Sequence, residues 1–306
     1  MADVVDDVEQ MIKEDILIAI GTDPSGELAA LALPQLLITY LNWRMRFIPA
    51  IPRQAHLSSE LLASPKYLEH RAAIDEIVRK IQVGEGLTSH LSNRVNRSYT
   101  PTAERKSQLQ YRQDLDLLLA EWGIHHLHFL AADGSQLHIP DLLFASFKPA
   151  DAFLIGVFDH KSWSDREVAR ICVTNWPQSG IFHEVHGVVG LAQQFTDDEH
   201  ALIHNAGGTS FLEIDGKVYV PPGQTMAGTP TAATADSNQV AWSLRRLRTL
   251  LHDEPEELES ILTGAGVDVA GGFTWKAAFE GGRYGIRDEH TGAFVCAVGI
   301  LDLVHH

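Results

Sequence analysis

The chain has 306 residues, of which 45% are hydrophobic and 21% charged, so it is a globular protein long enough for two or three domains. No stretch approaches the roughly 18 uninterrupted apolar residues that span a bilayer, and the N-terminus lacks a basic region followed by an apolar one. We therefore expect no membrane partner and a cytoplasmic location. A net charge of −16 opposes unassisted binding to nucleic acid, and DNA is not an expected partner.

The first part of the chain, residues 1–119, is predicted to be a helical region. Its apolar residues recur with the period of a helix in several stretches, and turn signals such as Asp23-Pro24-Ser25-Gly26 separate them. The predicted helices cover residues 4–20, 31–41, 58–68, 72–83 and 104–119. Charge is uneven here, because residues 1–30 hold eight acids and one base, whereas residues 94–112 hold five basic side chains and one acid.

The central region, residues 120–223, has the patterns of strands. Residues 124–130 are strand-like, and Asp133-Gly134 marks a tight turn after them. Two further apolar runs, residues 141–147 and 153–158, are joined by a short turn. The sequence therefore predicts an antiparallel hairpin in the same sheet as the first strand.

Two capping boxes predict helix starts in this region. In Ser164-Asp165-Arg166-Glu167 and Thr196-Asp197-Asp198-Glu199, the hydroxyl can accept from a free first-turn amide while the glutamate reaches back. Further on, Asp215-Gly216 stands between two short apolar runs, which is typical of a β-hairpin.

The last region, residues 224–306, is expected to begin with a loop that extends to residue 237. A helix capped by Asp236 or Ser237 follows, and Pro255 suits the first turn of another. A small meander is predicted from strands at residues 273–279, 283–287 and 293–303. The whole chain is expected to be α+β, with a helical N-terminal region followed by a mainly antiparallel sheet with short helices.

The histidines mark the candidate site. Nine of the sixteen lie between His125 and His204, and three of these stand together at positions 125, 126 and 128. Alternate side chains of a strand share a face, so His126 and His128 are expected side by side, about 7 Å apart. Two imidazoles at this spacing can act as acid and base on one phosphodiester, or can give two ligands to zinc. They can also be purely structural.

The zinc alternative needs more ligands than this pair. His200 and His204 are four residues apart on the predicted short helix, so they can bind as co-ligands with His126 and His128. The segment His183-Glu184-Val185-His186 is one residue short of the helical zinc-protease motif.

The order of elements after residue 120 resembles a known family. Two strands run into Phe158-Asp159-His160-Lys161-Ser162, and a helix with Arg166 and Arg170 follows. This order resembles the core of RelE/HigB-type toxin endoribonucleases over about residues 120–176. The resemblance implies RNA cleavage without a metal, by basic and imidazole side chains on a sheet. It implicates His160 and Lys161. Toxins of this type are small and basic, whereas this chain is long and acidic.

Three hypotheses follow. The first is a metal-independent endoribonuclease, toxin-like or a phage-defence effector, with RNA as partner and no cofactor. In it His126, His128 and His160 serve as acid and base, and Lys161 or Arg166 stabilises the phosphate. The second is a zinc-dependent hydrolase that uses His126, His128, His200 and His204. The third is a non-enzymatic module that binds a protein partner.

Overall fold

The computed structural model has the expected α+β class. It describes residues 3–20, 26, 28–93, 95, 116–160, 162–264, 266–269, 274–280 and 283–297. Several predicted features lie outside these residues, wholly or in part. These features are most of the predicted helix at 104–119, most of the basic stretch at 94–112, the end of the predicted strand at 293–303, and Lys161. No helix in the described ranges is long and apolar enough to cross a membrane.

Contacts divide the chain into two units. One is formed by Met1–Leu41 together with Ala233–His306, and the other by Asn42–Ala232. The expected regions, residues 1–119, 120–223 and 224–306, are based on where the predicted secondary structure changes along the chain. The contacts in the structure join the two ends of the chain into one unit, and such contacts cannot be read from local sequence patterns.

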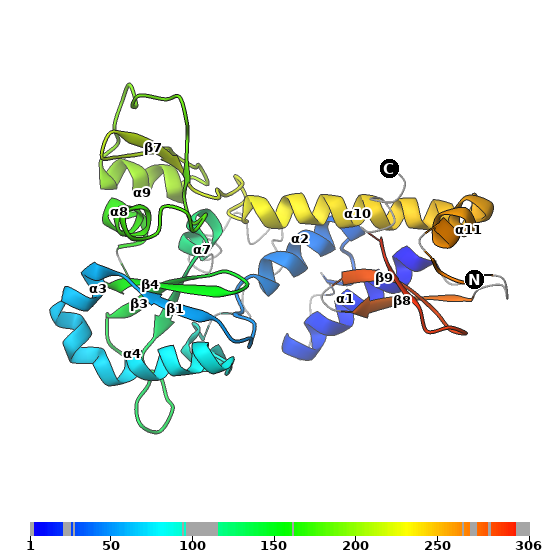
Figure 1. Ribbon diagram of the computed structural model, residues 1–306, viewed down its shortest axis with the longest axis horizontal. Coiled ribbons are helices and arrows are strands. Elements are labelled where there is room, and N and C mark those ends of the chain that lie inside the picture. Colours follow the sequence, from blue (N-terminus) through cyan, green and yellow to red (C-terminus); the bar gives the residue numbers. More distant parts are fainter. Residues whose placement is uncertain are drawn as a thin grey trace. The chain divides into compact units, whose positions relative to one another are not determined.

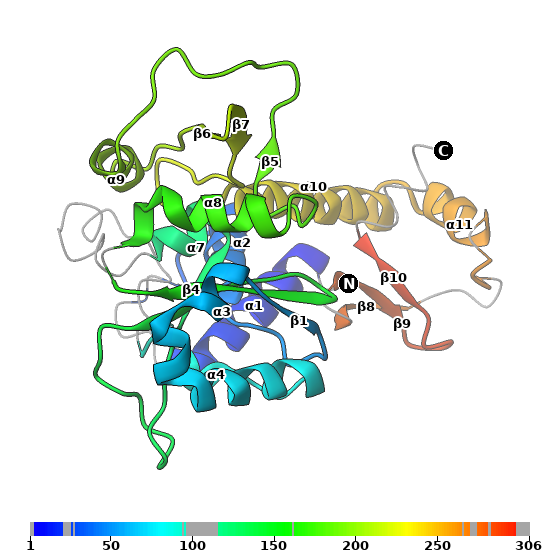
Figure 2. The ribbon, with the colours of Figure 1, turned by 60° about the vertical axis from the view of Figure 1, so that its left-hand side comes forward.

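A four-stranded sheet forms the centre of the unit Asn42–Ala232 (Figure 2). The strands are β1 (Gln54–Leu57), β4 (Asp151–Phe158), β3 (Leu142–Phe147) and β2 (Ile124–His128), in that order across the sheet. The pairs β3–β4 and β2–β3 are antiparallel, and β1 runs parallel to β4. This confirms the predicted hairpin and the place of the histidine strand beside it.

Helices cover both faces of this sheet, because both faces carry apolar side chains. On one face Leu127, Leu143 and Leu154 pack against α4 (Pro65–Val83). On the other, Ile124 and Phe144 pack against α7 (Leu117–Trp122) and α8 (Arg166–Asn175). In Figure 2, α4 and α8 lie on opposite sides of the strands. The side chains of His126 and His128 alternate with Leu127, so they belong to the α8 face.

The prediction for residues 54–83 needs correction. Strand β1 was not predicted, since its four residues between Pro52 and Ser58 are too few for a periodic signal. The helix predicted at 58–68 is interrupted, and the structure has α3 (Ser59–Ala63) followed directly by α4. Ser64 caps α4 by accepting a hydrogen bond from the amide of Lys66, and Pro65 takes the first helical position.

A second small sheet joins this unit, with the strand order β5 (His183–Glu184), β7 (Lys217–Val220) and β6 (Leu212–Ile214). The predicted hairpin at Asp215-Gly216 connects β6 and β7, and Asp215 has a positive φ of 52°. The capping box at Thr196 is confirmed at the start of α9 (Asp197–Asn205). The box at Ser164 is wrong, because Ser164 ends the 3-10 turn η2 (Ser162–Ser164) and Asp165 caps α8.

The other unit contains helices and a three-stranded meander (Figure 1). Its elements are α1 (Val4–Ile20), most of α2 (Leu33–Arg44), α10 (Thr231–His252), α11 (Pro255–Gly264), β8 (Trp275–Glu280), β9 (Arg283–Asp288) and β10 (Phe294–Cys296). The meander and the place of Pro255 are confirmed. The helix start at Asp236 or Ser237 is wrong, since α10 already begins at Thr231. Ser237 is buried within it and donates to the carbonyl of Pro34.

Candidate functional site

Three of the predicted histidines meet at the end of the central sheet. His126 and His128 project from β2, and His160 lies two residues beyond the end of β4. Their ring centroids are 5.8 Å apart for His126 and His128, 6.2 Å for His126 and His160, and 5.9 Å for His128 and His160. The three imidazoles thus form a nearly equilateral group. The strand period places the first two, and the turn after β4 brings the third.

An aromatic side chain from η2 closes one side of the group. The ring of Trp163 stacks on His126 with a centroid distance of 5.6 Å, and it lies 6.3 Å from His160. His126 is only 8% exposed. No sequence signal pointed to Trp163, because its role depends on the fold of the turn between β4 and α8.

These side chains line a cavity of about 430 Å³. His125 and His138 add two more imidazoles to its wall, and apolar side chains from the described loops complete it (Leu91, Val95, Leu137 and Ile139). Arg46 is the one cationic side chain among the described residues of the lining. It is buried and donates to the carbonyl of Val95, so its charge is held in place.

The cavity also includes a carboxylate that the sequence analysis overlooked. Asp116 caps α7, because one of its oxygens accepts a hydrogen bond of 3.1 Å from the amide of Leu119. Its other oxygen lies 3.4 Å from Nδ1 of His126. An aspartate directly before an apolar helix was a detectable cap signal. Its contact with His126 was not detectable, because it depends on the packing of α7 beside β2.

Burial and the repulsion between neighbouring imidazoles favour the uncharged form of three histidines of the cavity, His125, His128 and His160. Burial, followed by the neighbouring His126 and His160, lowers the pKa of His128 to about 4. The pKa of His160 is also lowered, first by burial and then by His126, although Asp159 opposes the shift. Burial likewise lowers the pKa of His125 to about 4. His128 is therefore a neutral imidazole near pH 7, with a lone pair for a proton or another electrophile.

Two other candidate residues are not brought to this cavity. The guanidinium Nε of Arg166 lies 2.8 Å from Asp197, in a separate charged groove that also contains Arg170. Lys161 is outside the described residues. Of the five residues proposed for catalysis, the structure therefore unites His126, His128 and His160.

The four histidines of the zinc alternative do not form one group. His200 bonds to Ser210 over 2.7 Å through Nδ1, and the buried His204 pairs with Glu121. Neither lines the cavity of His126 and His128. Within the described ranges, the group with ligand atoms within 4.8 Å of one another consists of other residues: Glu69, His70 and Asp141.

No family model, curated protein or solved structure matches this chain.

Proposed function

We propose that this protein is a metal-independent endoribonuclease with a catalytic group of His126, His128 and His160, two of which transfer protons at a phosphodiester. One observation carries the proposal: three imidazoles, each about 6 Å from the other two, line one cavity. Cleavage of RNA by its own 2′-hydroxyl needs a base and an acid close to one phosphate, and histidine suits both tasks near neutral pH. The resemblance to RelE/HigB-type toxins supports the same reaction.

The surroundings of the histidines suggest how the two tasks are divided. An oxygen of the Asp116 carboxylate lies 3.4 Å from Nδ1 of His126, so this carboxylate can hold the imidazole ring in one orientation. His126 is therefore assigned as the general acid. His128 is neutral near pH 7 because its pKa is about 4, and it is assigned as the general base.

The reaction balances with these assignments. His128 takes the proton of the ribose 2′-hydroxyl, and the 2′-oxygen forms a bond to phosphorus. The bond from phosphorus to the 5′-oxygen breaks, and His126 gives its proton to this leaving oxygen. The products are a 2′,3′-cyclic phosphate and a free 5′-hydroxyl. Arg46, fixed in the cavity wall, is assigned to stabilise the negative charge of the phosphorane.

The cavity also suits a nucleotide in size and lining. Its volume of about 430 Å³ lies within the range of roughly 300–1,000 Å³ for small-molecule sites. Imidazoles and Arg46 offer hydrogen-bond partners for a phosphate, while Leu137 and Ile139 give an apolar wall for a base or ribose.

Alanine substitutions test the proposal. We expect His126→Ala and His128→Ala each to reduce cleavage of a fluorescent RNA about 10²- to 10⁴-fold, which is the usual contribution of a general acid or base. His186→Ala is the matched control, because its side chain is 87% exposed and it is not in the cavity lining. Circular dichroism of each variant checks the fold.

The reaction products and the metal dependence complete the test. We expect cleavage to persist in EDTA, to yield 2′,3′-cyclic ends, and to fail on a substrate with 2′-deoxyribose at the scissile position. Activity that disappears in EDTA and returns with zinc would contradict the proposal and favour the metal-dependent hydrolase. Purified protein that cleaves no RNA with or without metal would favour the binding module.

A further inference from the structure

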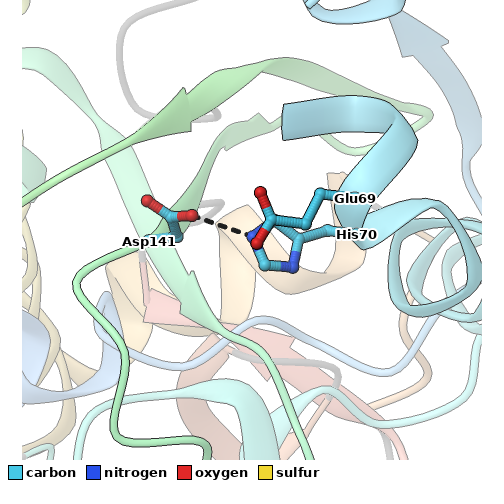
Figure 3. A group of neighbouring side chains, drawn as sticks. All are labelled: Glu69, His70 and Asp141. Carbon is cyan, nitrogen blue, oxygen red and sulfur yellow. Dashed lines mark hydrogen bonds and ion pairs between the residues drawn. The ribbon is translucent and has the colours of Figure 1, made fainter. Parts of the chain in front are cut away.

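A second cluster of ionisable side chains lies on the opposite face of the sheet. Glu69 and His70 are neighbours on α4, and Asp141 immediately precedes β3. Figure 3 shows the three side chains turned toward one another, with a dashed line between His70 and Asp141. One ligand atom from each lies within 4.8 Å of the other two. These residues have no part in the proposed ribonuclease site.

Two of the three side chains are held firmly. The His70 ring stacks on Phe129 with a centroid distance of 4.3 Å, and its side chain is 11% exposed. Its Nε2 lies 2.9 Å from Oδ2 of Asp141. The other oxygen, Oδ1, accepts a hydrogen bond of 2.7 Å from Lys66. A lysine that fixes the far oxygen orients the near one, as outer residues do in metal sites.

The third side chain adds a second carboxylate beside that of Asp141. Glu69 is exposed and has no hydrogen bond or ion pair with the described residues. Nevertheless, its carboxylate lies within 4.8 Å of that of Asp141, which is unfavourable for two negative charges. Lys66, which donates a hydrogen bond to Asp141, offsets one of these two charges. A divalent cation between the three donors would remove the repulsion.

The donor set limits which cation fits. One imidazole nitrogen with two carboxylates suits Zn²⁺ and similar transition metals, whereas Mg²⁺ and Ca²⁺ prefer oxygen donors alone.

We propose that Glu69, His70 and Asp141 bind one divalent transition-metal ion, with water in the remaining positions. The ion would take the place of the proton now shared by His70 and Asp141. It would tie α4 to the residue that immediately precedes β3. The proposed role is structural, and it does not depend on the proposed ribonuclease function.

Zinc binding to the metal-stripped full-length protein tests this site. Equilibrium dialysis should show one Zn²⁺ per wild-type chain, and Co²⁺ should give visible absorption bands when it occupies the site. The double variant Glu69→Gln/Asp141→Asn should lose this ion. Its affinity for Zn²⁺ should fall by more than about 100-fold, because loss of a residue that only supports a ligand already costs up to about 100-fold. Asp75→Asn, an exposed change on the same helix, is the matched control.

A thermal melt supplies the second readout. Zn²⁺ should raise the melting temperature of the wild type and of Asp75→Asn, and leave that of the double variant unchanged. The double variant keeps the stack of His70 on Phe129, so it should fold. The site is refuted if wild type binds no zinc, or if the double variant binds it equally well. Loss of the ion in His126→Ala/His128→Ala instead would place the metal in the histidine cavity.

Discussion

Asp116 has two roles, one in helix α7 and one in the histidine cavity. One carboxylate oxygen caps the helix, and the other contacts His126. The strand period predicted that His126 and His128 share a face, and the resemblance to the toxins added His160. Asp116 and Trp163 were not predictable, because their contacts join segments that are separate in the sequence.

Asp116→Asn tests this connection. Asparagine can still cap α7, but it replaces the carboxylate oxygen that lies 3.4 Å from Nδ1 of His126. We expect the rate of RNA cleavage to fall roughly tenfold or more. Asp133→Asn, in an exposed turn, should not change the rate. An unchanged rate in Asp116→Asn would leave the residue with its capping role alone.

At the scale of elements, the sequence predicted those with strong local signals. The hairpin β3–β4, the turn at Asp215-Gly216 and the capping box at Thr196 each depend on a few adjacent residues. The short strand β1 was missed, since it is defined by pairing with β4, for example of Gln54 with Asp151, 97 residues later. The prediction that Ser164 caps the helix was wrong for a local reason. Both Ser164 and the adjacent Asp165 are good capping residues, and Ser164 belongs to η2, which ends before α8 begins at Arg166.

The capping assignments predict different costs for similar substitutions. Thr196→Ala removes both hydrogen bonds that the threonine hydroxyl makes with Glu199, and Asp165→Ala removes the cap of α8. Each should lower the free energy of unfolding by about 1 kcal/mol. Ser164→Ala should have a smaller effect, because Ser164 is not the capping residue. Urea denaturation of the three variants measures the difference, and equal losses for Ser164→Ala and Asp165→Ala would contradict the assignment.

At the scale of the whole molecule, the buried imidazoles make stability depend on pH. His125 and His128 have pKa values of about 4 in the folded protein, against about 6.5 in an unfolded chain. Between these values the unfolded chain binds more protons than the folded one, so stability rises with pH. Their contribution is complete above pH 6.5 and is lost as the pH falls toward 4.

The wild type should therefore have a lower denaturation midpoint at pH 4.5 than at pH 7. In the double variant His125→Gln/His128→Gln the decrease should be smaller, because glutamine does not titrate. Urea titrations at the two pH values make the comparison, with the exposed His186→Gln as control. If the double variant lost stability as steeply as the wild type, other groups would be responsible for the acid sensitivity.

The division of the chain also sets an order for folding during synthesis. The unit Asn42–Ala232 is one uninterrupted segment, whereas the other unit needs Met1–Leu41 and residues from Ala233 onward. The ribosome therefore completes the unit Asn42–Ala232 before it has made β8, the strand that α1 contacts in the folded protein. At about 5–20 residues per second, the first 41 residues wait roughly 10–40 seconds before Ala233 is added. During that interval the apolar face of α1, with Val8, Ile12 and Ile16, is available to chaperones.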